Sequence, residues 1–235
     1  MRYSVISFDL DGTLVDTAGE IAEAANRTLA EFGVPRQDVA LITGFIGAGT
    51  RQMMLQLLAH VMLKEPALAD RLKVDDVLAR LEVHYGITAG MSAQPYPGCE
   101  DMLQQLRQAG VKLACLTNKE HRFATRVLDA TGLLGLFDYV VGGDSLPQRK
   151  PHAQTMHHVL NVLGGHTHRA AHVGDSRTDV ETARNAGVAA WAVPWGYNAG
   201  EPITVAGPDL IFTRLADIAG HVLAANDDHA PANAA

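Results

Sequence analysis

The chain has 235 residues, of which 47% are apolar and 19% charged, and its formal net charge is -7 at neutral pH. This is ordinary globular composition, with ample material for a buried core. The acidic balance, without any block of basic residues, excludes broad electrostatic attraction to nucleic acid or to an anionic membrane, so we expect neither as a partner.

The start of the chain and its cysteines indicate a cytoplasmic protein. Residues 1–6 reach the acidic Asp9 too soon to form the apolar part of a secretory signal, and no apolar stretch approaches the length of a membrane span. The two cysteines, Cys99 and Cys115, are too few for a disulfide framework. We expect a monomer or a homodimer.

Short apolar runs rich in β-branched and aromatic residues predict strands. They cover residues 3–8, 111–116, 139–141, 170–173 and 188–193, with a weaker run at 209–212. Helical patterns lie between them at residues 100–108, 122–131, 153–163 and 178–185. Each of these patterns ends close to a glycine, which is typical of a helix C-terminus. The alternation predicts an α/β fold with a Rossmann-like parallel sheet covered by helices on both faces.

One segment, residues 16–94, breaks this alternation. It contains no convincing strand run, and its apolar residues recur at helical spacing. The helical patterns cover residues 20–32, 50–64 and 67–85. We interpret the segment as an all-helical domain inserted after the first strand, which leaves residues 1–15 and 95–224 for the α/β core. Residues 225–235 are small and polar and are expected to form a disordered tail.

Polar clusters follow four of the predicted strands. In an open parallel sheet, functional residues gather beyond the carboxyl ends of the strands. The clusters are Asp9, Asp11 and Thr13; Thr117, Asn118 and Lys119; Lys150, beyond a loop; and residues 174–179, which include Asp175 and Asp179. Each cluster alone is explained by a turn, a helix cap or a solvated lysine. Four of them at successive strand ends favour one shared site.

With these clusters the chain resembles the haloacid dehalogenase superfamily of phosphatases, over essentially its whole length up to the tail. The four motifs of that superfamily read Asp9-Leu10-Asp11-Gly12-Thr13-Leu14-Val15-Asp16, Leu116-Thr117-Asn118-Lys119, Lys150-Pro151 and Gly174-Asp175-Ser176-Arg177-Thr178-Asp179. The inserted helical segment is similar to the cap domain of the superfamily.

The resemblance implies Mg²⁺-dependent hydrolysis of a small phosphate ester through an aspartyl-phosphate intermediate. Asp9 would be the nucleophile. Asp11 would protonate the departing alkoxide and then take a proton from the attacking water. Two carboxylates this close favour a bound cation, and Mg²⁺ prefers oxygen ligands. Asp9, Asp175 and the backbone carbonyl of Asp11 would hold the ion.

The remaining motif residues suit the phosphoryl group. Thr117 would offer a hydroxyl donor and Lys150 a fixed positive charge. Gly12 would let the backbone turn closely around the phosphate, so that amides of the Gly12-Thr13 loop are available as donors. Asn118 would donate to the same group.

Two further residues are expected near the site. Asp179 would hold the metal-binding loop or Lys150 in position without being a metal ligand itself. Arg51, just after the glycine-rich residues 44–49, is the candidate for contacting a substrate carboxylate. A lone arginine at the start of a helix is also common without any such role.

Outside the four motifs the chain resembles the bacterial phosphoglycolate phosphatases, in residues 96–98, 117–119, 142–147 and 196–202. This resemblance implies 2-phosphoglycolate as the substrate, with glycolate and phosphate as products. The chain departs from the family at His152-Ala153, where an aspartate and a proline are common, and at Glu120, where a proline is frequent.

Asp11 narrows the reaction, because dehalogenases and phosphonate hydrolases of the superfamily lack a second aspartate at that place. A sugar-phosphate phosphatase and a phosphomutase of the same fold remain alternatives. A non-catalytic regulatory protein that binds a phosphate ligand is a third. The helical insertion, which selects the leaving alcohol in such proteins, would decide among the enzymes.

Overall fold

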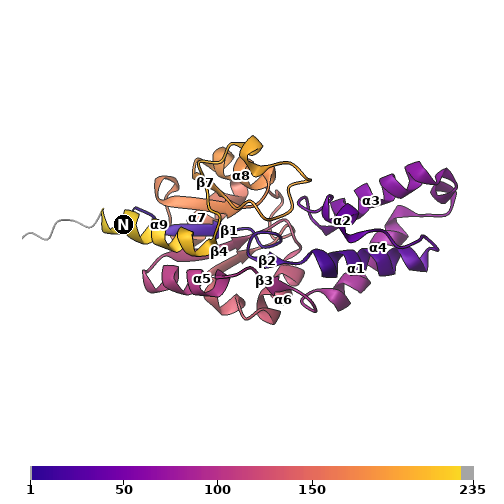
Figure 1. Cartoon of the computed structure of the whole chain (residues 1–235), viewed down its shortest axis with the longest axis horizontal. Coiled ribbons are helices and arrows are strands. Elements are labelled where there is room, and N and C mark those ends of the chain that lie inside the picture. The colour runs from indigo at the N-terminus through magenta and orange to yellow at the C-terminus, as the bar shows by residue number, and fades with distance from the viewer. Residues whose placement is uncertain (1, 229–235) are drawn as a thin grey trace, which may run out of the picture.

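The computed structural model describes residues 2–228, and its centre is a parallel sheet of six strands in the order β5-β4-β1-β6-β7-β8 (Figure 1). The strands are β1 (Val5–Phe8), β4 (Lys112–Leu116), β5 (Tyr139–Val141), β6 (Ala170–Gly174), β7 (Ala189–Ala192) and β8 (Leu210–Ile211). All six lie within two residues of the predicted runs, and the predicted α/β fold class is confirmed.

Successive side chains of each strand point to opposite faces of the sheet, and helices cover both faces. Ile6 and Phe8 of β1 belong to one apolar cluster, whereas Val5 belongs to another on the opposite face. The first cluster includes residues of α5 (Cys99–Gln108), α6 (His121–Ala130) and α9 (Leu215–Asp227). The second includes residues of α7 (Ala153–Leu163) and α8 (Arg177–Ala186).

Between β2 (Val15–Asp16) and β3 (Gln94–Pro95) the chain leaves the sheet and forms helices that we call the cap. They are α1 (Ala18–Glu31), α2 (Val39–Thr43), α3 (Thr50–Lys64) and α4 (Val74–Thr88). The strands β2 and β3 pair antiparallel, so the outgoing and returning segments lie side by side. Figure 1 shows the cap at the end of the molecule opposite the N-terminus.

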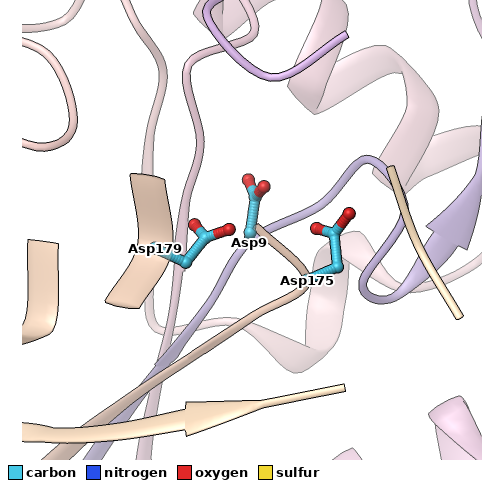
Figure 2. Close-up of side chains that lie close together, drawn as sticks. All are labelled: Asp9, Asp175 and Asp179. Atoms are coloured by element: carbon cyan, nitrogen blue, oxygen red, sulfur yellow. The ribbon is translucent and has the colours of Figure 1, made fainter. Parts of the chain in front are cut away.

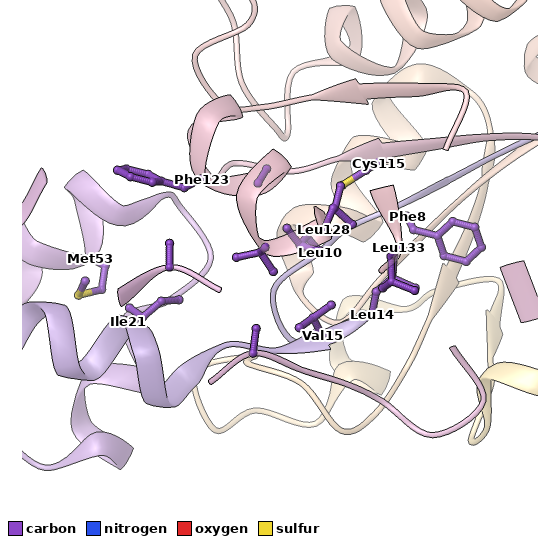
Figure 3. Packing of buried hydrophobic residues seen from close by; sticks show 14 of the residues in the cluster. Phe8, Leu10, Leu14, Val15, Ile21, Met53, Cys115, Phe123, Leu128 and Leu133 are labelled. Carbon is purple, nitrogen blue, oxygen red and sulfur yellow. The ribbon is translucent and has the colours of Figure 1, made fainter. Parts of the chain in front are cut away.

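The cap and the sheet share one apolar core. The cluster that contains Phe8 and Leu10 runs through Leu14 to Ile21 on α1 and Met53 on α3 (Figure 3). Burial of apolar surface is the main favourable term in folding. This continuous packing therefore seats the cap against the edge of the sheet from which Asp9 projects.

The cap helices differ in part from the prediction. Residues 67–85, expected as a single helix, form a 3₁₀ helix (Pro66–Asp70) and then α4, which begins at Val74. Leu68 and Leu72 are both buried where the chain turns, so the apolar spacing continues although the backbone does not. The short helix α2 was not predicted.

The C-terminal expectation is corrected as well. Helix α9 extends to Asp227, so residues 225–227 are helical and not part of a disordered tail. Asn226 explains this end, because its side chain accepts from the Tyr3 amide at 2.7 Å and donates to the Tyr3 carbonyl at 3.0 Å. Residues 229–235 lie outside the described part. From residue 2 to 228, no helix has the length and apolar character needed to cross a membrane.

Candidate active site

The register of the sheet brings three of the predicted clusters together. Phe8 of β1 pairs with Cys115 of β4 and with Val173 of β6. Asp9, Thr117 and Asp175 therefore leave neighbouring strands at the same edge. They line a cavity closed by the cap. Its other lining residues are Asp11, Ile21, Ile46, Gly47, Gly49, Thr50, Met53, Asn118, Lys119, Ser176 and Tyr197.

Three buried carboxylates converge beside this cavity. Asp9, Asp175 and Asp179 each offer one oxygen within 4.8 Å of the others (Figure 2). Burial raises the pKa of Asp9 to about 6, although the charge of Lys150 opposes this. Burial, followed by the nearby charges of Asp179 and Asp9, raises the pKa of Asp175 well above its usual range. Carboxylates that are crowded and costly to ionise suit a divalent cation with oxygen ligands, so the donor set fits Mg²⁺.

Lys150 joins two of these carboxylates. Its ammonium lies 2.9 Å from Asp9 Oδ1 and 2.7 Å from Asp179 Oδ1, and only 3% of the residue is exposed. Burial favours the neutral acid at Asp179, but the charge of Lys150 holds the pKa of this carboxyl well below its usual range. Asp179 also accepts from the Ser176 amide at 3.1 Å, and His172 Nε2 lies 3.2 Å away. The Asp179 carboxylate therefore holds Lys150 and the start of α8 in position.

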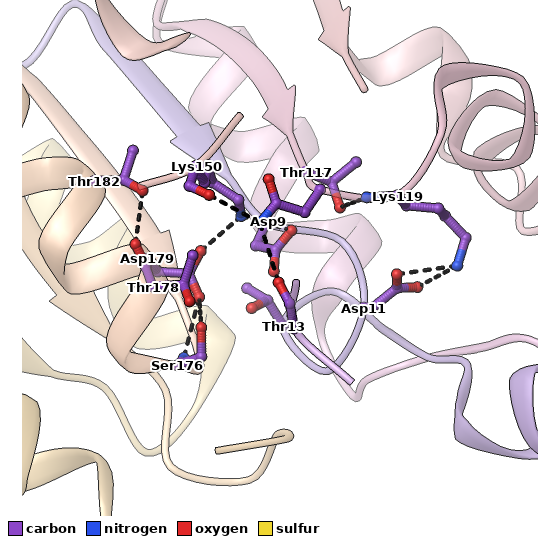
Figure 4. A network of polar contacts seen from close by, with 12 residues as sticks. Asp9, Asp11, Thr13, Thr117, Lys119, Lys150, Ser176, Thr178, Asp179 and Thr182 are labelled. Atoms are coloured by element: carbon purple, nitrogen blue, oxygen red, sulfur yellow. Dashed lines mark hydrogen bonds and ion pairs between the residues drawn. The ribbon is translucent and has the colours of Figure 1, made fainter. Parts of the chain in front are cut away.

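The Asp11 side chain points toward Lys119 and away from Asp9 and Asp179 (Figure 4). Its carboxylate accepts from Thr17 Oγ1 at 2.7 Å and from Lys119 Nζ at 2.7 and 3.0 Å. The Lys119 ammonium also lies 4.9 Å from the centre of the Tyr85 ring on α4. Lys119 was part of the second polar cluster in the sequence but had no predicted role, and its position beside Asn118 in the second motif was the only signal for one.

The loops after β1 and β7 hold Asp175 in place. Thr13 Oγ1 donates to Asp175 Oδ1 at 2.8 Å, and the Tyr197 amide donates to Asp175 Oδ2. A Cβ at Gly12, where φ is +80°, would lie 2.6 Å from Asp175 Oδ2, and one at Gly196 would lie 2.2 Å from it. Only glycine fits such approaches. The prediction named Gly12 and Thr13 but not Gly196 or Tyr197.

Tyr197 also connects the core to the cap. Its hydroxyl accepts from the Thr17 and Ala18 amides at 2.9 and 3.0 Å and donates to Asp16 Oδ1 at 2.5 Å. These amides belong to the start of α1, where backbone N–H groups have no partner within the helix. The residue that positions Asp175 through its amide therefore fixes the first cap helix through its side chain.

Thr117 and Asn118 differ in what they leave available to a ligand. Thr117 Oγ1 accepts from the Lys119 amide at 3.2 Å, and Thr117 lines the cavity. Asn118 was expected to donate to phosphate. Instead its amide nitrogen donates to the Gly47 and Lys150 carbonyls, both at 3.1 Å, and so links the cap loop to the loop that carries Lys150.

Arg51 lies apart from this cavity. It is exposed and lines a second cavity between α3, α4 and α6, together with Glu82 and Arg122. The structure therefore does not bring Arg51 to the three carboxylates, in contrast to the expectation that it contacts the substrate. Thr50 at the start of α3 lines both cavities, whereas Arg51, the next residue, lines the second cavity and not the first.

Comparison with known proteins agrees with this arrangement. The model of the haloacid dehalogenase-like hydrolase family matches residues 6–193. A phosphoglycolate phosphatase of Thiobacillus denitrificans is 35% identical over 214 residues, which cover 91% of this chain and 93% of that protein. A plasmid-encoded phosphoglycolate phosphatase of Cupriavidus necator is 39% identical over 194 residues, which cover 83% and 82%.

A solved structure with a similar fold also carries the name phosphoglycolate phosphatase. The crystal structure of a predicted phosphoglycolate phosphatase from Haemophilus somnus has a TM-score of 0.83 and 30% identity, and the match covers 94% of this chain and 98% of that one. The family match spans most of the chain and includes Asp9, Thr117, Lys150 and Asp175. The chain belongs to the haloacid dehalogenase-like hydrolases.

Proposed function

We propose that the protein is a Mg²⁺-dependent phosphomonoesterase that hydrolyses 2-phosphoglycolate to glycolate and phosphate through an aspartyl-phosphate. The observation that carries the proposal is the setting of Asp9. Its buried carboxylate lies 2.9 Å from the Lys150 ammonium and beside Asp175, and Asp11 faces the same cavity. The names of the relatives from Thiobacillus denitrificans and Cupriavidus necator support the choice of substrate.

In the first half of the proposed reaction, a carboxylate oxygen of Asp9 attacks phosphorus. The bond between phosphorus and the ester oxygen breaks, and Asp11 in its acid form gives a proton to the departing alkoxide. Lys150 and Thr117 hold the phosphoryl oxygens while negative charge spreads over them. Mg²⁺, held by Asp9, Asp175 and the backbone carbonyl of Asp11, would balance the negative charge of the carboxylates and the phosphoryl group.

In the second half, Asp11 accepts a proton from water, which attacks the phosphorus of the aspartyl-phosphate. The bond between phosphorus and the Asp9 oxygen breaks, and Asp9 returns to a carboxylate. Cap residues such as Ile21 and Met53 line the cavity and limit the access of other water.

The substrate is tested with a panel of small phosphate esters assayed with Mg²⁺ for release of phosphate. We expect 2-phosphoglycolate to have the highest kcat/KM. A kcat/KM for 2-phosphoglycolate far below the values for sugar phosphates or nucleotides would show that 2-phosphoglycolate is not the substrate. An isomerised ester without free phosphate would indicate a phosphomutase, and ligand binding without turnover on any ester would indicate a regulatory protein.

The nucleophile is tested with Asp9→Asn. An amide cannot form the acyl phosphate, so we expect turnover to fall by about three orders of magnitude or more. Circular dichroism and Tm should show an intact fold, because the amide keeps the volume of the buried acid. Asp101→Asn, at an exposed position on α5, is the matched control and should keep full turnover. Activity retained in Asp9→Asn would exclude Asp9 as the nucleophile.

A further inference from the structure

We propose that Lys119 determines substrate specificity by binding the carboxylate of the leaving group. The inference rests on the proposed function and gives it a substrate class, namely phosphate esters of short 2-hydroxy acids. The residue lies in the loop after β4 and is only 2% exposed, yet it lines the catalytic cavity.

The charges of the cavity support this assignment. The acidic and basic residues that line it are Asp9, Asp11, Asp175 and Lys119, so Lys119 is the one cation among the lining residues that the structure describes. Lys150 lies deeper, between Asp9 and Asp179. A substrate with one anionic group needs a cation only at the phosphate end. A substrate with a second anionic group needs another, and Lys119 is the cation available for it.

The position of Lys119 relative to Asp11 is also suitable. Asp11 would protonate the ester oxygen, and the Lys119 ammonium lies 2.7 Å from Asp11 Oδ1. In 2-phosphoglycolate a single carbon separates the ester oxygen from the carboxylate, so the carboxylate would reach the neighbourhood of Lys119. A lysine ammonium has three N–H donors. The hydrogen bonds that it makes with described residues all go to the Asp11 carboxylate.

The apolar residues on the cap side of the cavity favour a short anionic leaving group over a sugar. Ile21, Ile46 and Met53 from the cap are apolar and offer no partners for sugar hydroxyls. Thr50 and Gly49 line the same cavity and form the start of α3, a helix of 15 residues. The amides at a helix start stabilise nearby negative charge. Lys119 and the start of α3 thus border one cavity from the core side and the cap side.

Two esters that differ only at the carboxylate separate this role from general catalysis. They are 2-phosphoglycolate and 2-hydroxyethyl phosphate, in which a neutral CH₂OH replaces the carboxylate. We expect Lys119→Met to lower kcat/KM for 2-phosphoglycolate about 100-fold more than for 2-hydroxyethyl phosphate, because it removes a charge-assisted contact made by one ester only. Lys119→Arg should recover part of this difference. Lys64→Met, at an exposed position on α3, is the matched control and should leave both values unchanged.

Inhibition by the product gives a second readout that does not depend on turnover of 2-phosphoglycolate. Glycolate should inhibit hydrolysis of p-nitrophenyl phosphate by the wild type, whereas ethylene glycol should not. Lys119→Met should abolish the inhibition. If Lys119→Met does not fold, Lys119→Gln serves in both assays, with circular dichroism to verify the fold.

The outcomes distinguish the two proposals. A wild type that prefers 2-hydroxyethyl phosphate, or another neutral ester, overturns the proposed substrate. A wild type that prefers 2-phosphoglycolate, with equal losses on both esters in Lys119→Met, overturns only the role of Lys119, because the residue then acts through Asp11. An unchanged ratio together with retained inhibition by glycolate overturns it too. A shift of the ratio in Arg51→Met alone would assign the carboxylate to Arg51.

Discussion

Among single residues, Glu20 is a buried acid in the cap beside the candidate active site. It lies in the first turn of α1 and is 2% exposed. Its Oε2 accepts from the Gly90 amide at 2.8 Å. Burial raises the pKa of Glu20 to about 7, although the charge of Lys119 and the hydrogen bonds from the Gly90 and Ser92 amides oppose this rise. An acid that is costly to ionise in the folded state makes stability depend on pH.

The sign follows from the two pKa values. Between the ordinary value of 4.5 and the folded value of about 7, the folded state binds more protons at Glu20 than the unfolded state does. The contribution of Glu20 to the free energy of unfolding is therefore fully present below pH 4.5 and declines as the pH rises to about 7. Glu20→Gln should lack this decline and should become more stable relative to the wild type between pH 5 and pH 8.

Urea denaturation at pH 5 and pH 8 measures this change. Glu23→Gln on the same helix is the control, because its ion pairs with Arg27 and Arg36 lower the pKa of Glu23 below 4.5. Its difference from the wild type should stay constant between pH 5 and pH 8. The same constant difference in Glu20→Gln would contradict a raised pKa at Glu20.

At the scale of elements, the sequence predicts the sheet better than the ends of the cap helices. Strands such as β4 and β6 are almost entirely buried and mostly apolar because helices cover both faces of the sheet. Helix α9 was not predicted, although Leu215, Ile218, Ala219 and Val222 are buried at helical spacing. The many small residues that follow made this helical pattern difficult to recognise. The C-terminal end of α9 at Asp227 depends on hydrogen bonds to the distant backbone of Tyr3.

In the candidate site, too, some contacts could be predicted from the sequence and others could not. The rule of strand ends brings Asp9, Thr117 and Asp175 together from the sequence alone, because register in a parallel sheet follows from the strands. The ion pair of Lys119 with Asp11 and the contact of Tyr197 with the start of α1 were not predicted. These contacts depend on how loops and the cap pack in three dimensions, which no local pattern encodes.

A loop contact of this kind leads to a prediction about Gly143. A Cβ built there would lie 2.2 Å from the Asn118 carbonyl oxygen, and the Gly143 amide donates to the Lys119 carbonyl at 2.8 Å. Gly143→Ala should therefore displace the loop that carries Asn118 and Lys119. We expect the free energy of unfolding to fall by about 1–3 kcal/mol, as for other overpacked sites, and kcat/KM to fall with it.

The matched substitution is Gly220→Ala in α9. A Cβ at Gly220 meets nothing within 4 Å, and the residue is exposed in the middle of a helix. Alanine is the better helix former there, so the free energy of unfolding should rise by about 0.4–1 kcal/mol with activity unchanged. Urea denaturation of both variants tests the pair, and equal effects would show that the approach of Gly143 to Asn118 is not a constraint.

For the whole molecule, the candidate metal site connects distant parts of the chain. Asp9 follows β1 and Asp175 follows β6, far apart in the sequence. An unfolded chain would not hold these carboxylates together. A cation that binds them would thus bind the folded state alone, and its binding free energy would add to the stability of the fold.

We therefore expect Mg²⁺ to raise Tm. At an Mg²⁺ concentration 100 times Kd the gain is about 2.7 kcal/mol, and a chain of this size shifts by roughly 2–4 °C per kcal/mol, so Tm should rise by about 5–10 °C. Excess EDTA should reverse the rise. Sodium chloride at equal ionic strength is the control, since screening alone should not reproduce it. Asp175→Asn removes one ligand charge and should abolish most of the shift. A Tm that is unchanged by Mg²⁺ would show that Asp9 and Asp175 do not bind this ion. The charge of these carboxylates would then be balanced within the protein by Lys150 and by protonation of Asp9 or Asp175.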